Sequence, residues 1–407
     1  MAKDASVSPI PIDVVGIGAD GWGGLSASTR SIVEAADVVF GSRRQLQTIP
    51  VAQDRLRPWP SPLLPNLRST IEEFDGNRIC VLASGDPMFH GIGVTLAREF
   101  GAPRLRVISS PSSLSLACAR LGWAVHTTAC VSLVNEPAAT LIPALSDGSR
   151  VVVLSRGSET PSEVLSILRD AGFGQSTVTV LENLGGPDER SSTGTAATWT
   201  HEPGDPLNVV AVDCVEDRTH TRLTRVPGLP DRAYTGDGQL TKSEVRALTL
   251  SALAPSPGEL LWDVGGGSGS IAIEWMRTHP TCRATVYESM GHRRRQIETN
   301  ARALGVPGAR VVGGAPESFD SETPDAVFIG GGLTQDGMLD VCWSCLPPGG
   351  RLVANAVTAE SEAFLLECVS RFGGVLRKFQ IYRAEPLGSF TSWRPQLPVA
   401  QWAVVKP

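Results

Sequence analysis

Glycines and acids near the start of the second half of the chain are its best-placed residues for chemistry. An apolar run ends in Asp263, and three glycines follow it at alternate positions, Gly265, Gly267 and Gly269. Glycines at this spacing let the backbone approach a ligand closely, and the N-terminus of a following helix favours electron-rich groups. About 20 residues later Glu288 ends the next apolar run, where a carboxylate can accept hydrogen bonds from both hydroxyls of a ribose. The pattern predicts a site for an adenosine-bearing cofactor.

Two cofactor classes fit this glycine loop. Residues 267–272 (GSGSIA) match the G-x-G-x-x-A variant of the dinucleotide fingerprint. However, Asp263 in front of the loop resembles motif I of class I S-adenosylmethionine (AdoMet) methyltransferases, in which an acid at this place commonly faces the methionine half. A dehydrogenase has less need of that acid, because it would repel a pyrophosphate. The loop therefore favours AdoMet over a nicotinamide cofactor, and a plain strand-to-helix turn stays as the third alternative.

Two further glycine-rich loops lie in the first half of the chain. Gly16 and Gly18 follow one apolar run, and the tripeptide Gly85, Asp86, Pro87 follows another. Alone, such a tripeptide indicates only a turn, because Asp hydrogen-bonds its own backbone and Pro fixes the next φ.

Length, charge and cysteine usage exclude several classes of protein. The 407 residues predict two or three domains at about 150 residues each. Acidic residues outnumber basic ones, 42 against 36, so no overall field draws the surface to nucleic acid. Of the eight cysteines, the close pair Cys342 and Cys345 has no second pair or nearby histidine to complete a zinc site. We expect no metal site and no nucleic-acid partner.

The chain also lacks the sequence features of export and membrane insertion. Its first residues, MAKDASVS, have no basic flank followed by an apolar core. Apolar residues nowhere run together for the roughly 18 positions that a membrane span needs. These features predict a cytoplasmic protein without a membrane partner.

The elements that must position these loops follow an α/β rhythm of short β-branched runs, glycine-rich turns and helical patterns. Strand-type runs occur at residues 12–18, 78–83, 105–109, 149–154, 177–181 and 207–212, and again at 260–264, 284–288, 310–313, 325–329 and 351–355. Between the two series lies a charged stretch with Pro227 and Pro230 and no apolar period. We predict domains at residues 1–215 and 236–407 joined by a linker at 216–235.

The second domain resembles a known family over essentially all of residues 228–407. The segments that carry the resemblance are 228–248, 300–319, 324–332 and 349–358, of which QLTKSEVRAL and FIGGG are the most specific. They resemble the C-terminal domain of the precorrin-6Y C5,15-methyltransferase (decarboxylating) family of vitamin B12 synthesis. The resemblance implies a Rossmann-like class I methyltransferase fold with AdoMet as cofactor. One departure is the middle glycine of the run 265–267, Gly266, where the family more often has alanine or cysteine.

The first domain resembles the tetrapyrrole methylases, the class III AdoMet methyltransferases, over about residues 10–215. The resemblance rests on the Gly-Asp-Pro loop and on residues 108–123, 183–189 and 208–212. It implies two α/β halves with AdoMet in the cleft between them, held mostly by main-chain groups. The matching positions are Gly85, Asp86, Pro87, Ser112, Leu154 and Ala211. The first loop departs from the family form, so only Gly16 and Gly18 carry over from it.

Together the resemblances imply a bifunctional enzyme with one AdoMet site in each domain. It would methylate the meso carbons C5 and C15 of precorrin-6B and remove the ring C acetate carboxylate, giving precorrin-8X. A sulfonium methyl already has a good leaving group, so no dedicated catalytic side chain is required. Two alternatives stay open: methylation of RNA, because the folds also serve RNA targets, and a regulatory protein that binds AdoMet without turnover.

A polycarboxylate substrate needs local cations, and four residues of the second domain are candidates: Lys242, Arg246, Arg383 and Arg394. For each of them a solvated surface position is the alternative. His90 could move a proton beside the substrate, and Trp393 could stack on the macrocycle. The run of arginines at 293–295 is typical of a solvated helical face. We also expect the chain to form a homo-oligomer.

Overall fold

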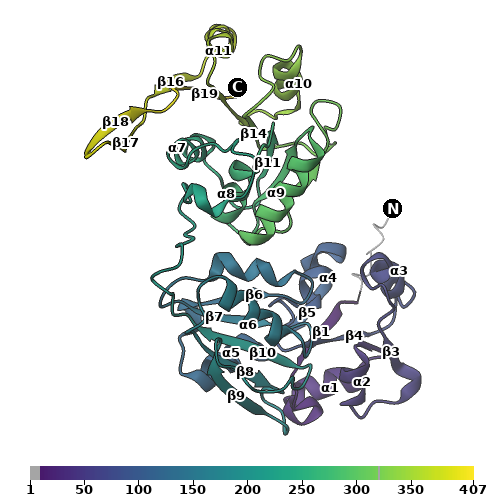
Figure 1. Cartoon of the computed structure of the whole chain (residues 1–407). Helices are drawn as coiled ribbons and strands as arrows, with labels where there is room; N and C mark the ends of the chain where they lie inside the picture. Colours follow the sequence, from purple (N-terminus) through teal and green to yellow (C-terminus); the bar gives the residue numbers. More distant parts are fainter. Residues whose placement is uncertain (1–9, 320) are drawn as a thin grey trace, which may run out of the picture. The chain divides into compact units, whose positions relative to one another are not determined.

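The structure is a computed structural model that describes residues 10–319 and 321–407. The chain divides into two compact units, one of residues up to 138 with 144–217, the other of 139–143 with 218–407 (Figure 1). Each unit contains sheets and helices, as the alternating pattern predicts; the linker at 216–235 stays a prediction. Within the described residues, no helix is long and apolar enough to cross a membrane.

The first unit begins with a parallel sheet in the order β3-β2-β4-β1-β5. Its strands are β1 (Ile12–Ile17), β2 (Val38–Gly41), β3 (Leu56–Pro58), β4 (Ile79–Ser84) and β5 (Leu105–Ile108), and its helices are α1 (Ala27–Ala35), α2 (Arg43–Gln47), α3 (Leu67–Glu72) and α4 (Ile92–Phe100). Because all five strands run the same way, the loops after β1, β4 and β5 emerge at one edge of the sheet.

A second sheet of the same unit has the order β6-β7-β10-β8-β9, and in it only β6 and β7 are parallel. It consists of β6 (Thr128–Ser132), β7 (Arg150–Leu154), β8 (Thr177–Glu182), β9 (Arg190–Thr195) and β10 (Asn208–Asp213), with α5 (Ser113–Leu121) and α6 (Thr160–Asp170). Helix α5 begins where the Ser112 hydroxyl accepts the N–H of Ser115, and it ends at Gly122, whose φ of 67° is left-handed.

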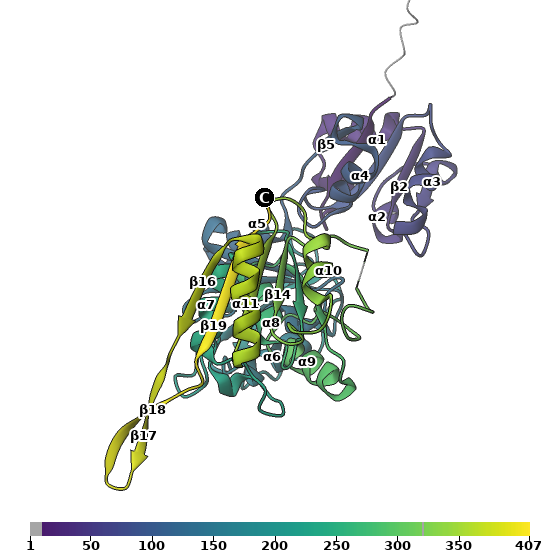
Figure 2. The same ribbon diagram turned by 90° about the horizontal axis from the view of Figure 1, so that it is seen from above.

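The second unit is built on a seven-stranded sheet in the order β13-β12-β11-β14-β15-β19-β16. The strands are β11 (Leu260–Val264), β12 (Arg283–Tyr287), β13 (Arg310–Val312), β14 (Ala326–Ile329), β15 (Arg351–Ala356), β16 (Val375–Phe379) and β19 (Val399–Val405), of which β19 is antiparallel to both of its neighbours. The hairpin of β17 (Tyr382–Leu387) and β18 (Phe390–Pro395) extends beyond this sheet (Figure 2).

Alternation along the strands gives this sheet two apolar faces. Leu261 and Phe328 pack with α7 (Ser243–Leu253), α8 (Ser270–Thr278) and α9 (Gly291–Ala303). Trp262 and Trp402 lie on the other face with α10 (Met338–Cys345) and α11 (Ala359–Phe372). The strand order reverses between β11 and β14, and at such a point the two outgoing loops diverge and leave a crevice for ligands.

A buried ion pair fastens the start of this unit to its sheet-covering helix α8. Glu274, only 2% exposed, accepts hydrogen bonds from the backbone N–H groups of Gly228 and Leu229 and from the Tyr234 hydroxyl. Arg246, fully buried, donates its Nε–H to Glu274 at 2.8 Å. The segment that leads into α7 is therefore held by one carboxylate.

We predict that Glu274→Ala lowers the free energy of unfolding by about 3–5 kcal/mol, because it removes the buried counter-ion of Arg246 and leaves only the partly exposed Asp231, 3.3 Å away. The measurement is urea unfolding of the full chain followed by fluorescence of the buried tryptophans. Glu322→Ala is the control, since it removes the exposed partner of Arg283 and should cost less than about 1 kcal/mol. Equal, small losses in both variants would contradict the role given to Glu274.

Candidate functional site

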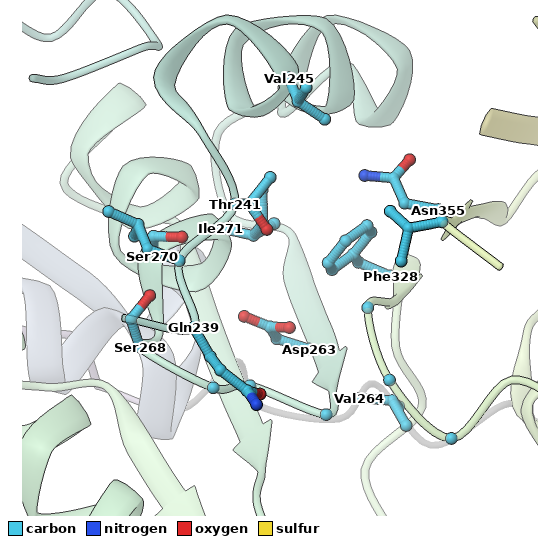
Figure 3. Close-up of a pocket in the computed structure, with 18 of the residues that line it drawn as sticks. Gln239, Thr241, Val245, Asp263, Val264, Ser268, Ser270, Ile271, Phe328 and Asn355 are labelled. Carbon is cyan, nitrogen blue, oxygen red and sulfur yellow. The ribbon is translucent and has the colours of Figure 1, made fainter. Parts of the chain in front are cut away.

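A cavity of about 620 Å³ opens at the reversal point of the seven-stranded sheet. Loops after β11, β12, β14 and β15 form its floor, and α7 with the segment before it forms its roof (Figure 3). This volume is typical of pockets for small molecules. Of the residues predicted from the sequence, five line it: Lys242, Asp263, Gly265, Gly267 and Glu288.

The glycines of the first loop serve different purposes. Gly265 has a φ of 76°, and a Cβ on it would lie 2.7 Å from the backbone of Gly331, so only glycine lets the loops after β11 and β14 approach. Gly267 faces open cavity, where the nearest atom to a built Cβ is the Gln239 carbonyl oxygen at 3.4 Å. Gly269 does not line the cavity, because it packs against Ile297 of α9. Its predicted cofactor contact is corrected to a packing role.

Glu288 follows β12 with its carboxylate turned towards the glycine loop. One carboxylate oxygen accepts the N–H of Gly267 at 2.9 Å, and the other accepts the N–H of Met290 at 2.9 Å. The residue is 5% exposed and lines the cavity. Each oxygen keeps lone pairs for further donors, so the carboxylate can also accept the hydroxyls of a ribose.

Asp263 lies at the end of β11 beneath the cavity and is 1% exposed (Figure 3). Its carboxylate accepts the N–H of Ala272, in the first turn of α8, at 3.1 Å. Burial, with a smaller contribution from the charge of Glu288, raises the pKa of Asp263 to about 7 despite that hydrogen bond. A ligand that brings positive charge would stabilise the ionised form of this acid, because the attraction offsets the cost of a buried negative charge.

A strap of residues 239–242 closes the cavity from above. It is tied down by Asp237, which pairs with Arg293 of α9 at 2.8 Å. The next arginine, Arg294, donates to the carbonyl oxygens of Glu288 and Ser289 at 2.8 and 2.7 Å. The prediction of a solvated arginine face is therefore wrong for these two residues, which hold the edges of the site.

The end of the cavity beyond β14 is mostly apolar. It is lined from β15, β16, β19 and adjoining segments by Val357, Phe379, Ile381, Leu397 and Val399, together with Phe328 and the amides of Asn355 and Gln396. Figure 3 shows Phe328 and Asn355 on the side of the cavity opposite Ser268 and Ser270, with Asp263 between them. Sequence reasoning assigned none of these residues, because their signal was only a resemblance of segments without roles.

The four predicted substrate cations have different surroundings. Lys242 lines the cavity, 3.9 Å from Asp231. Arg246 is fully buried in its pair with Glu274, so its predicted substrate contact is corrected to a structural role. Arg383 pairs with Glu244 at 2.7 Å, and Arg394 pairs with Glu385 on the exposed hairpin, at 3.0 Å. A substrate carboxylate at either of the last two would compete with these acidic partners.

In the first unit, the predicted residues of the parallel sheet meet at its edge. A Cβ on Gly16 would lie 2.1 Å from the carbonyl oxygen of Gly85, and the Gly16 carbonyl accepts the Ser110 hydroxyl at 2.8 Å. A Cβ on Gly85, whose φ is 59°, would lie 3.4 Å from the Cα of Ser112. The structure thus brings Gly16, Gly85 and Ser112 together at this edge.

The remaining residues of these loops have local partners. Asp86 accepts the N–H of Met88 at 2.8 Å, and the Pro87 carbonyl accepts the N–H of Gly93 at 3.0 Å, which is the turn that the tripeptide alone predicts. Gly18 lies just after β1, beside Asp20. His90 is exposed, with its ring against Phe89.

Leu154 and Ala211 belong to the second sheet of the first unit. Leu154 ends β7, and Ala211 lies in β10 between β7 and β8. Both side chains are buried in one apolar cluster with Leu114 of α5. Helix α5, which begins beside Ser112, thereby joins these positions to the glycine edge of the first sheet.

Comparison with known proteins gives matches over both units. Residues 12–199 match the family of tetrapyrrole (corrin/porphyrin) methylases, and residues 232–406 match a precorrin methyltransferase domain. A Mycobacterium tuberculosis precorrin-6Y C(5,15)-methyltransferase [decarboxylating] is 49% identical over 97% of this chain and 100% of its own. A Sinorhizobium protein of the same name is 45% identical over 100% of this chain and 98% of its own.

A shorter relative covers less of the chain. The cobalt-precorrin-6B C(15)-methyltransferase (decarboxylating) of Salmonella typhimurium is 30% identical over 39% of this chain and 85% of its own.

The raised pKa of Asp263 predicts how stability changes with pH. The folded, ligand-free protein holds this proton up to about pH 7, whereas the unfolded chain releases it near 3.8, so wild-type stability falls across that window as pH rises. Asp263→Asn has no proton to lose at this position. The free energy of unfolding of this variant, relative to that of wild type, should therefore rise between pH 3.8 and about 7 and then level off. The plateau is about 4 kcal/mol at most, from about 1.4 kcal/mol per pKa unit.

Urea unfolding at a series of pH values measures this difference. Asp340→Asn is the matched control, because that carboxylate is exposed and its variant should track the wild type at every pH. A constant offset for Asp263→Asn at all pH values would refute the raised pKa.

Proposed function

The chain belongs to the precorrin-6Y C5,15-methyltransferase (decarboxylating) family, and from this premise we propose its reaction and the residues that carry it. It is a methyltransferase of cobalamin biosynthesis that uses AdoMet. Its substrate is precorrin-6B, which it methylates at C5 and C15 and decarboxylates at the ring C acetate, giving precorrin-8X. We place this reaction in the cytoplasm, with one AdoMet site in each unit.

The observation that carries the proposal is the two-ended cavity of the second unit. Its polar end holds two buried carboxylates, Asp263 and Glu288, on either side of the glycine loop. Its other end is apolar and suits a large conjugated ring. We assign AdoMet to the polar end, where the loop backbone at Gly265 and Gly267 would contact it. We assign the macrocycle to the apolar end.

In the first unit we assign AdoMet to the edge of the parallel sheet where Gly16, Gly85 and Ser112 lie close together. The proposed contacts are Gly16, Gly18, Gly85, Asp86, Pro87, Ser112, Leu154 and Ala211, with His90 beside the substrate. The close approach of Gly16 to Gly85 supports a site built from backbone rather than from side chains.

We assign C15 methylation and decarboxylation to the second unit, and C5 methylation to the first. The Salmonella relative is named for the C15 and decarboxylation steps together, and it aligns with only 39% of this chain. One unit of such a size is therefore sufficient for both steps in that relative. The acetate arm lies beside the carbon to be methylated, so a single pocket can serve both reactions.

The residues of the cavity orient the reactants and exclude water rather than act as an acid or a base. AdoMet supplies the methyl group, with S-adenosylhomocysteine as leaving group. Glu288 orients the ribose, Asp263 faces the positively charged half of the cofactor, and the strap at 239–242 excludes water. Such positioning accounts for a large part of the barrier reduction in bimolecular transfers. Lys242 remains to hold a peripheral carboxylate of the substrate.

The test is incubation of the full chain with precorrin-6B and methyl-labelled AdoMet, followed by the mass of the product. Wild type should add two methyl groups and release carbon dioxide. Gly267→Arg fills the polar end of the second-unit cavity, so its product should carry one new methyl and keep the carboxylate. Asp86→Arg disrupts the first-unit loop, so its product should carry one new methyl and have lost carbon dioxide.

Gly258→Arg is the matched control for Gly267→Arg, because Gly258 also has a positive φ, 89°, with no atom within 4 Å of a built Cβ. It should behave as wild type. A doubly methylated product from Gly267→Arg or from Asp86→Arg would refute the corresponding site.

We also infer that the chain self-associates through the hairpin of β17 and β18. Cross-strand register places six uncharged residues on one hairpin face: Tyr382, Ala384, Pro386, Thr391, Trp393 and Pro395. Trp393 is 71% exposed and Tyr382 is 55% exposed. A two-stranded hairpin is marginally stable alone in water. A face without cations suits an identical uncharged face in a second copy better than a polycarboxylate.

Light scattering during gel filtration tests this inference. Wild type should elute as an oligomer, and Trp393→Ser should shift it towards the monomer, because the largest side chain of the uncharged face is lost. Leu64→Ser is the control, since Leu64 is similarly exposed, at 69%, in the first unit. A monomeric wild type, or an unchanged Trp393→Ser, would contradict the interface.

A further inference from the structure

A polar cluster lies at the apolar end of the second-unit cavity. Asn355 on β15 is opposite Gln401 on β19, and its Oδ1 accepts from Gln401 Nε2 at 3.1 Å. Its Nδ2 donates to the Thr249 hydroxyl of α7 at 2.9 Å. Gln401 Nε2 also approaches that hydroxyl, at 3.2 Å. Thr249 and Gln401 are buried, at 0% and 1% exposure, whereas Asn355 lines the cavity.

The direction of these hydrogen bonds fixes the Asn355 amide. Thr249 uses its only O–H on the carbonyl oxygen of Val245, at 2.8 Å. Its oxygen can then only accept, so the partner atom on Asn355 must be the nitrogen. The amide cannot turn over without placing two acceptors against each other. One N–H of Asn355 is left for a ligand.

The position of this N–H relative to the cofactor end follows from the sheet. Asp263 and Asn355 lie on the same face, on strands separated by β14 alone. In register, Asp263 is level with Val353, two residues before Asn355, so two strand spacings of about 4.8 Å and a rise of about 3.3 Å per residue place the two backbones about 12 Å apart. A carboxylate bound at Asn355 can therefore belong to a short side chain of a substrate ring whose methylated carbon lies at the cofactor end.

Among the described residues that line the cavity at this apolar end, none is a cation. Val357, Phe379, Ile381, Leu397 and Val399 line the same end, and Gln396 is the second amide there. A carboxylate held here would keep one neutral hydrogen bond and little water. A bound cation would stabilise the charged carboxylate and oppose its loss, whereas a poorly solvated carboxylate is raised in energy relative to neutral carbon dioxide.

We propose that Asn355 is a positioning residue for decarboxylation, donating its free N–H to the substrate acetate that is lost. This proposal rests on the function proposed above. The bond between the acetate methylene and its carboxyl carbon breaks, its electron pair enters the conjugated ring, and carbon dioxide leaves. A proton from solvent then converts the methylene into a methyl group, so the atoms and charges balance. Thr249 and Gln401 act through Asn355 by fixing its amide.

The test measures the ratio of two methylated products, one that has lost carbon dioxide and one that has kept the carboxylate. Asn355→Leu keeps the size and removes the donor, and Asn355→Asp keeps the shape and places a like charge beside the acetate. In both variants the ratio of decarboxylated to carboxylated product should fall about tenfold or more, as expected for a lost hydrogen bond to a charged group. Binding of AdoMet, measured by calorimetry, should be unchanged.

Asn77→Leu is the matched control, because it makes the same change at an exposed amide that does not line the cavity and has no contact with the Thr249 network, and its product ratio should equal that of wild type. A wild-type ratio in Asn355→Leu would overturn the proposal. Loss of AdoMet binding in both Asn355 variants would overturn it too, by making Asn355 a cofactor or folding residue. Should only the leucine variant lose AdoMet binding, the product ratio of the aspartate variant decides. Failure of the proposed function is distinct, since wild type itself would then add no methyl group.

Discussion

The buried pair of Glu274 and Arg246 is the interaction on which the site of the second unit depends. Neither charge is in contact with water, so each must satisfy its hydrogen bonds within the protein. Glu274 does so with the backbone of the segment before α7, and Arg246 does so with the carbonyl groups of Leu229 and Thr241. The pair thereby sets where α7 starts and where the strap at 239–242 crosses the cavity. Through α7 it also sets the height of Thr249 above the sheet.

Within that frame, the cavity separates charge from apolar surface along the sheet. Carboxylates gather at the ends of β11 and β12, and aliphatic and aromatic side chains gather beyond β14. Burial of Asp263 raises its pKa and makes its ionisation costly, so a ligand that brings positive charge favours loss of its proton. The overall charge of −6 is thus a poor guide to this region, where the local arrangement of two acids decides which ligand is favoured.

In the first unit, the proposed cofactor site is built from fewer side chains. Its loops approach so closely at Gly16 and Gly85 that no side chain fits between them. The Asp86 side chain is engaged in its own turn, which shapes the loop. The two proposed AdoMet sites therefore differ in character, one rich in carboxylates and one built from main chain.

The sequence alone determined the α/β class, the principal strands and the glycine loop with Asp263 and Glu288, because apolar periodicity and glycine spacing are local properties of the chain. It did not reveal the hairpin of β17 and β18, whose uncharged and polar residues carry no clear core pattern. It also misplaced Arg246 and Gly269, since an arginine in a helix and a glycine before one look the same whether they face a ligand or the interior. Only the tertiary structure decided that Arg246 meets Glu274 and that Asn355 stands beside the apolar end of the cavity. These contacts join residues far apart in the chain, and their chemistry depends on burial, which no single segment specifies.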